Sequence, residues 1–178
     1  DLATFVASMR PDQLRRFEEA LDDEDRLLLE RAWAQHYGQG WRSSPAAMAE
    51  HVGDVPGMPR GFRRWRYVDL LSDKFVDAVR GTDARQLWNL PSQYGKTTIL
   101  CTIGAPWALA DDPTRRIMYV TFDANKAVEE GGKARDWIEA HPELGVELRP
   151  DRRARGMWRT KQGGGLYCVG IYGGIVGW

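Results

Sequence analysis

The stretch Leu90-Pro91-Ser92-Gln93-Tyr94-Gly95-Lys96-Thr97-Thr98 decides the fold that we expect for this chain. A short apolar run, 86–90, precedes it and suits a buried strand, and a helical pattern over 99–109 follows it directly. Strand, glycine-containing loop and helix in this order are typical of a phosphate-binding loop, where backbone N–H groups and the positive end of the helix surround a phosphate. The sequence therefore predicts a nucleotide site at this loop.

The residue types in the loop match that chemistry. Lys96 would neutralise the β- and γ-phosphates, and the Thr97 hydroxyl is placed to bind Mg²⁺, so both are candidate catalytic residues. Gly95 allows the backbone to approach a phosphate without a Cβ in the way. The candidate nucleotide contacts are Pro91, Ser92, Gln93, Tyr94, Gly95, Lys96, Thr97 and Thr98. The loop departs from the common pattern, because Leu90 stands at the usual first glycine; a helix cap with a solvated lysine is the alternative.

The rest of the C-terminal part alternates between helix and strand patterns. We expect helices over 66–80 and 125–140, with Pro106 bending or ending the helix that follows the loop, and a turn at 111–113. We expect a buried strand over 116–122 and two strands, 157–160 and 166–171, joined around Gly163-Gly164-Gly165. Strands and helices in alternation predict an α/β fold with a parallel sheet flanked by helices.

The N-terminal part predicts a small helical appendage. Helices are expected over 11–21, from the acidic run at 22–25 to about residue 37, and over 44–53, where Ser44 would cap and Pro45 would open the helix. The glycine- and proline-rich stretch 53–59 is the expected boundary. The sequence thus predicts an appendage over 1–55 and a nucleotide-binding domain over 56–178.

The 178 residues carry 25 basic and 25 acidic side chains, but residues 1–55 hold 6 of the basic and 11 of the acidic ones. The zero net charge is therefore the sum of an acidic appendage and a basic domain. Two arginine clusters, at 60–66 and 149–159, could contact DNA phosphates, with a solvated charged surface as the alternative. We expect the second cluster to have a loop at 152–155.

Composition excludes several other classes. No apolar stretch approaches the length of a membrane span, and the first residues do not resemble a signal peptide. Two cysteines, Cys101 and Cys168, cannot form a disulfide framework or a metal cluster, which favours a reducing, cytoplasmic setting. Because the chain begins at Asp1 and ends at Trp178 after an apolar, glycine-rich segment, we expect it to be part of a longer protein.

The loop Leu90–Thr97 resembles the deviant Walker A loop of the large terminase subunit of tailed bacteriophages, in which proline commonly replaces glycine early in the loop. Other segments are similar to the elements that surround that loop in the same family. These segments are 67–74, 117–122, 135–138, 158–160 and 165–177. The likeness spans roughly residues 60–178 and extends to the order and spacing of four elements.

The resemblance implies an ASCE/RecA-like P-loop NTPase fold that binds ATP and Mg²⁺. It implies an ATPase that moves double-stranded viral DNA through a portal into a procapsid, in the host cytoplasm. The implied partners are the portal protein, the small terminase subunit and further copies of the same chain in a ring. The family's Walker B aspartate and catalytic glutamate would follow Trp178, so we expect residues 1–178 alone to bind nucleotide with slow or no turnover.

The resemblance also implies two further groups of contacts. Many relatives have an arginine inside the Walker A loop, where this chain has Ser92 and Gln93. An arginine finger would then come from elsewhere, and the candidates are Arg153, Arg155 and Arg159. The family contacts adenine just upstream of the helix before the loop, which gives Trp65, Arg66 and Tyr67, with aromatic packing as the alternative.

Two other functions stay open at this stage. A different P-loop NTPase, such as a helicase or small-molecule kinase, would carry the same loop, although we find no lid or acceptor pocket for a kinase. A portal or small-subunit docking module would use the acidic helices of residues 1–55, with the loop as an ordering switch.

Overall fold

The computed structural model describes residues 40–58 and 61–173. The predicted helices over 11–21 and 22–37 lie outside these residues, as do Arg60 of the first arginine cluster and residues 174–178. A compact unit begins at Arg42 and contains the phosphate-loop segment. The helix predicted over 44–53 is packed within this unit, and the expected boundary near residue 55 stays a prediction.

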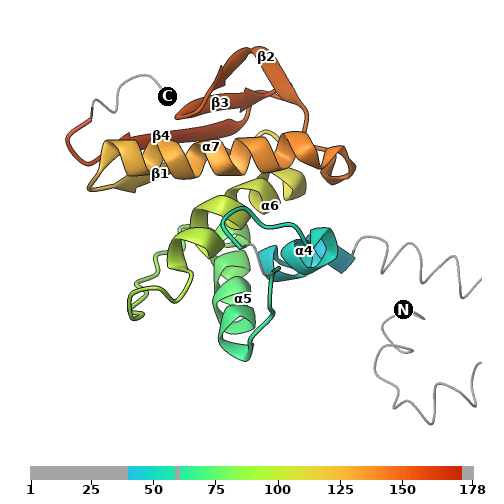
Figure 1. Ribbon diagram of the computed structural model, residues 1–178, viewed down its shortest axis with the longest axis vertical. Helices are drawn as coiled ribbons and strands as arrows, with labels where there is room; N and C mark the ends of the chain where they lie inside the picture. Colours follow the sequence, from blue (N-terminus) through green and yellow to red (C-terminus); the bar gives the residue numbers. More distant parts are fainter. Residues whose placement is uncertain (1–39, 59–60, 174–178) are drawn as a thin grey trace, which may run out of the picture. The chain divides into compact units, whose positions relative to one another are not determined.

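A four-stranded mixed sheet forms one layer of the unit (Figure 1). Its strands are β1 (Arg116–Thr121), β2 (Leu148–Ala154), β3 (Met157–Thr160) and β4 (Gly165–Gly170), in the order β1-β4-β3-β2. β1 and β4 are parallel, whereas β4, β3 and β2 pair antiparallel. The predicted parallel sheet is therefore correct for β1 and β4 and wrong for the other two pairs.

The helix α7 (Ala124–Ala140) lies along β1 and β4, as Figure 1 shows. Asp123 caps it by accepting hydrogen bonds from the backbone N–H groups of Asn125 and Lys126. Its buried face includes Ala127, Ala134, Trp137 and Ile138, as predicted, while Val128 is exposed instead of buried. The Trp158 indole on β3 donates to the carbonyl of Gly131 over 3.0 Å, which fixes the helix against the sheet.

Three further helices pack around the π-helix η2 (Thr98–Ile103), which follows the phosphate loop (Figure 1). They are α4 (Pro45–Val52), α5 (Arg66–Arg80) and α6 (Gly104–Asp111). The described residues also form two 3-10 turns, η1 (Gly40–Ser43) and η3 (Pro142–Leu144). Ser44 caps α4 through its hydroxyl and Gly53 ends it with a φ of 75°, both as the sequence predicts. None of the helices in the described part of the chain is long and apolar enough to cross a bilayer.

Pro106 does not end the helix that follows the loop. The chain continues from η2 into α6 as far as Asp111, with Pro106 in the first turn of α6. Proline removes one backbone donor and crowds the carbonyl four residues earlier, here that of Thr102. The wider π-helical turn directly before it accommodates both effects.

One predicted strand is absent, and one predicted loop is a strand. Residues 86–90 form no strand, and Leu87 is 87% exposed, because a strand requires a neighbour to satisfy its backbone groups and none is paired with this segment in the described sheet. The expected loop over 152–155 is instead β2 followed by a tight turn into β3. The predicted buried strand is only half buried: Met118 and Val120 on β1 and the following Phe122 are exposed, while α7 packs against the strand.

Candidate functional site

The predicted phosphate loop is an exposed turn that leads directly into a helix. Helical structure begins at Lys96, and the Ile99 N–H donates to the Gly95 carbonyl over 2.9 Å. Backbone N–H groups in the first turn of a helix have no partner within the helix and are available to an anion. The predicted loop-to-helix junction is thus present.

The backbone of the loop has two residues in the left-handed region. Gly95 has a φ of 72°, and apart from its two chain neighbours no described residue has an atom within 4 Å of the position that a Cβ on Gly95 would occupy. Gln93 has a φ of 66°, which for a non-glycine residue costs about 1 kcal/mol or more. Such strain is concentrated at ligand sites, and the open space beside Gly95 fits a group that approaches the backbone closely.

The Lys96 side chain lies across the loop. Its Nζ donates to the carbonyl of Leu90 over 2.7 Å and to the carbonyl of Pro91 over 2.5 Å. Both acceptors are neutral backbone groups, so the ammonium has no carboxylate partner among these contacts. An anion at the loop would offer this cation stronger, charge-assisted hydrogen bonds.

Thr97 lies next to β1. Tyr119 is half buried on that strand, and burial raises the pKa of its phenol above the usual value, while a hydrogen bond with the Thr97 side chain opposes the rise. The structure therefore places Thr97 at the junction of the loop and the sheet. In the described residues no cluster of three or more His, Cys, Asp or Glu side chains could hold a metal, so a bound Mg²⁺ would rely on Thr97 and on the phosphates.

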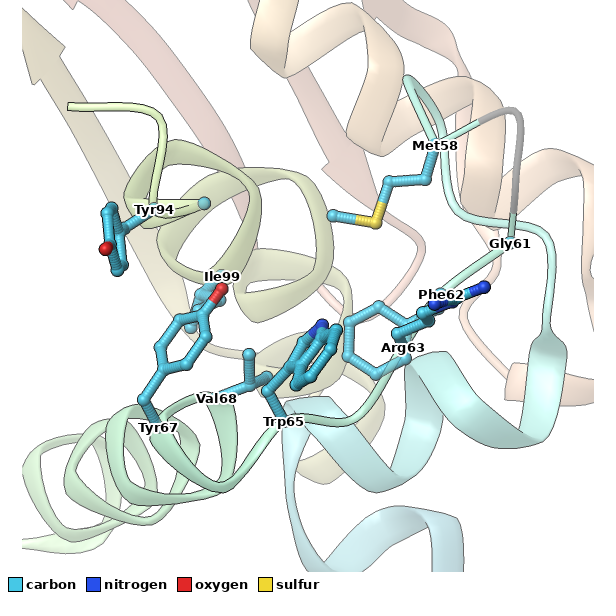
Figure 2. Close-up of a pocket in the computed structure, with 10 residues that line it drawn as sticks. Met58, Gly61, Phe62, Arg63, Trp65, Tyr67, Val68, Tyr94 and Ile99 are labelled. Atoms are coloured by element: carbon cyan, nitrogen blue, oxygen red, sulfur yellow. The ribbon is translucent and has the colours of Figure 1, made fainter.

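A pocket of about 320 Å³ adjoins the loop (Figure 2). Tyr94 and Gly95 of the loop form one side of it, and Trp65 and Tyr67 at the start of α5 form another. Figure 2 shows the side chain of Val68 between those of Trp65 and Tyr67, and the ring of Tyr94 on the side of Tyr67. The remaining lining residues are Met58, Gly61, Phe62, Arg63, Val68 and Ile99.

Two of the three predicted adenine contacts thus line this pocket. Trp65 and Tyr67 do so, whereas Arg66 does not. Met58, Phe62 and Arg63 also line the pocket and were not predicted from the sequence. A signal for Phe62 and Arg63 was present, because they stand directly upstream of the predicted contact Trp65 in a segment rich in aromatic residues and arginine.

The candidate arginine fingers lie on the β2–β3 hairpin and mostly pair with α7. Arg153 contacts Glu139 at 2.5 Å, and Arg155 lies 3.8 Å from Asp136. Arg159 is on β3 and half buried. None of the three arginines lines the pocket beside the loop, and neither does Lys96.

A buried polar cluster supports the helix that carries the loop. Glu130 on α7 accepts from the Thr102 hydroxyl at 2.9 Å and from Lys133 Nζ at 2.7 Å. Cys101 and Cys168 are buried nearby, and the pKa of the Cys101 thiol is raised well above its usual value by its hydrogen bond with Cys168 and by burial. These contacts join η2, which follows Lys96 and Thr97 in the chain, to α7 and β4.

The residues present fit a nucleoside triphosphate. Lys96, the first helical turn and the space beside Gly95 suit the phosphates, and the adjoining aromatic pocket suits a planar base. Comparison with protein-family models, curated proteins and solved structures finds no match to this chain.

Proposed function

We propose that this chain binds ATP with Mg²⁺ at the loop 91–98 and is the ATPase region of a large terminase subunit of a tailed bacteriophage. The observation that carries the binding proposal is a shared boundary: Tyr94 and Gly95 belong to the loop and also line the aromatic pocket. A single ligand with a polyphosphate at one end and a flat ring at the other matches this arrangement. The terminase assignment is supported by the resemblance of the loop and of the segments around it.

Each loop residue has a role in this proposal. Lys96 would leave the carbonyl groups of Leu90 and Pro91 and bind the β- and γ-phosphates, because charged acceptors bind an ammonium more strongly. The backbone N–H groups from Gly95 to Thr97 would bind phosphate oxygens, assisted by the dipole of the helix that follows. Mg²⁺, when bound to the Thr97 hydroxyl, would neutralise charge that develops on the phosphates during hydrolysis.

The base would lie in the pocket between the loop and α5. Its aromatic walls are partly exposed, with Trp65 at 55%, Tyr94 at 47% and Tyr67 at 39%. A bound base would cover this surface and stack on it, which contributes about 1–3 kcal/mol per aromatic contact. The proposed ATPase would use this binding, in the longer protein, to move double-stranded DNA through the portal of a procapsid.

The nucleotide proposal is tested by measuring the Kd for ATP·Mg²⁺ with Lys96→Ala and with a matched lysine variant, Lys161→Ala. Lys161 is exposed at the turn between β3 and β4, where it pairs with Glu147, and does not line the pocket. Hydrogen bonds to charged groups contribute about 1.5–3 kcal/mol, so Lys96→Ala should weaken binding about ten- to a hundred-fold and Lys161→Ala should leave it unchanged. Equal affinities for all three proteins would contradict the proposal.

The packaging role is tested separately. Purified procapsids with portal, double-stranded DNA, ATP and the polypeptide that contains this chain should take up DNA, and the same mixture with Lys96→Ala should not. DNA uptake at the same rate by both proteins would contradict the assignment of Lys96 to a packaging motor.

A further inference from the structure

We propose that Tyr94 is a base-stacking residue that connects the phosphate loop to the base pocket: its backbone belongs to the loop, and its ring forms a stacking wall for the base. This inference rests on the proposed nucleotide binding and adds a residue that contacts the base by stacking. The ligand class is a nucleoside triphosphate whose base is held by its ring faces.

The position of Tyr94 carries the first part of this argument. It directly precedes Gly95 and Lys96 and follows Gln93, whose φ of 66° fixes the turn of the loop. Its ring leaves the loop toward α5 and meets the ring of Tyr67 with centroids 5.6 Å apart and an interplanar angle of 60° (Figure 2). This tilted contact lies within the range of favourable aromatic pairs, so the side chain is held at the pocket while the backbone stays in the loop.

The composition of the pocket carries the second part. Aromatic and aliphatic side chains dominate the lining, and the guanidinium of Arg63 is the one formal charge among the described lining residues. None of these described residues has a carboxylate or carboxamide side chain. Carboxylate and carboxamide oxygens are strong acceptors for the N–H donors on the edge of a guanine or adenine base, and among these side chains only the hydroxyls of Tyr67 and Tyr94 could accept instead. The lining side chains therefore favour stacking on ring faces over recognition of the edge of the base.

The two parts together predict a link between base and phosphates. A base stacked on Tyr94 would hold the residue next to Gly95, and so would hold the loop in the conformation that meets the phosphates. Removing the ring should weaken ligands that have a base and spare ligands that consist of phosphates alone. A residue needed only to shape the loop would weaken both kinds of ligand equally.

The experiment measures the Kd for ATP, GTP and inorganic tripolyphosphate, each with Mg²⁺, on wild type, Tyr94→Ala and Tyr94→Phe. Tyr172→Ala is the matched control, since Tyr172 is also an exposed tyrosine but lies outside the pocket and pairs with Phe122. Loss of one stacking contact corresponds to about a ten- to hundred-fold loss of affinity. We expect this loss for ATP and GTP with Tyr94→Ala, no change for tripolyphosphate, and wild-type affinities with Tyr94→Phe and Tyr172→Ala.

Several results would overturn the inference. If Tyr94→Ala leaves the affinities for ATP and GTP unchanged, Tyr94 does not stack on the base. If Tyr94→Ala weakens tripolyphosphate binding as much as ATP binding, Tyr94 only shapes the loop. A hundred-fold preference of the wild type for ATP over GTP, or the reverse, would show that the edge of the base is recognised, and would contradict binding through ring faces alone. Lys96→Ala distinguishes the two levels: if it leaves ATP and tripolyphosphate binding unchanged, the proposed function fails together with this inference, whereas a Lys96-dependent site that is insensitive to Tyr94 overturns this inference alone.

Discussion

At the scale of single residues, Glu130 is a buried charged group whose removal we expect to lower the stability of the fold. It is 9% exposed and accepts hydrogen bonds from the Thr102 hydroxyl and the Lys133 ammonium. The bond from Thr102 connects α7 to the π-helix that follows the phosphate loop, whereas the bond from Lys133 lies within α7. The Glu130 carboxylate therefore stabilises the packing of α7 against the helix that follows the loop, and it does not line the pocket.

Glu130→Ala should lower the free energy of unfolding by about 1–3 kcal/mol, because a buried hydroxyl and a partly buried ammonium lose their acceptor. Glu129→Ala is the matched control: Glu129 contacts the same lysine at 2.9 Å, but its side chain is 60% exposed. An exposed ion pair is screened by solvent and contributes little to stability, so this variant should remain close to wild type. Urea unfolding of both variants measures the difference, and similar losses for the two would show that burial of Glu130 adds nothing.

Cys101 predicts how stability depends on pH. The folded protein keeps this thiol protonated because its pKa is raised, whereas in the unfolded chain it ionises near its usual pKa of 9.0. The unfolded state then binds fewer protons than the folded state, so the free energy of unfolding should fall as the pH rises above about 9, with a slope of at most about 1.4 kcal/mol per pH unit.

The measurement is urea unfolding under reducing conditions at pH 8 and pH 10, for wild type and Cys101→Ala. The wild type should lose more stability between these two pH values than the variant does. Equal losses in the two proteins would mean that the thiol ionises alike in the folded and unfolded states.

At the scale of elements, the packing of α7 on the sheet depends on two neighbouring glycines that differ in their surroundings. A Cβ on Gly131 would overlap the buried Cys168 sulfur and lie 3.0 Å from the Arg155 carbonyl oxygen. A Cβ on Gly132 would lie 2.6 Å from Arg155 Nε, in a side chain that is 59% exposed and free to move. The same substitution therefore meets a rigid neighbour at one position and a flexible one at the next.

Gly131→Ala should destabilise the protein by about 1–3 kcal/mol through overpacking. Gly132→Ala should be neutral or stabilising by up to about 1 kcal/mol, since alanine favours a helix interior over glycine. Thermal or urea unfolding compares the two variants directly. If Gly132→Ala were the more harmful one, α7 would not approach β4 as described.

Elements with local signals were predictable from the sequence. Ser44, Pro45 and Gly53 define both ends of α4, and the apolar, β-branched content of residues 116–121 indicates β1. β2 was missed, because a strand of arginines and aspartate at the edge of a sheet has almost no apolar alternation. Residues 86–90 were assigned wrongly, since an apolar run does not reveal whether a neighbouring strand is present to pair with it.

The candidate site was predictable only where its residues are adjacent in sequence. The order of Gly95, Lys96 and Thr97 between a turn and a helix is local, and the structure has it. The contact between Tyr94 and Tyr67 joins residues 27 positions apart in the chain, and it depends on how α5 packs against η2. For the same reason Met58 could not be assigned to the pocket from its local sequence.

At the scale of the whole molecule, nucleotide binding should stabilise the fold, because only the folded chain brings the loop next to the pocket. A ligand at a hundred times its Kd adds about 2.7 kcal/mol, which corresponds to a rise of about 5–10 °C in Tm for a chain of this size. ATP·Mg²⁺ should produce this rise in the wild type and a much smaller one in Lys96→Ala at the same concentration. Differential scanning fluorimetry makes the comparison, and an identical rise in both proteins would place the bound nucleotide away from the loop.

The central claim is that the loop and the aromatic pocket form one nucleotide site. Its most direct test is a titration of the ¹⁵N-labelled chain with ATP·Mg²⁺, followed by the amide signals of Gly95, Lys96 and Thr97 and by the indole N–H signal of Trp65. We predict that these signals shift together, with one shared Kd, and that the amide signals on β2 do not move. Saturable shifts confined to β2, or shifts at the loop and at Trp65 with different Kd values, would contradict a single site.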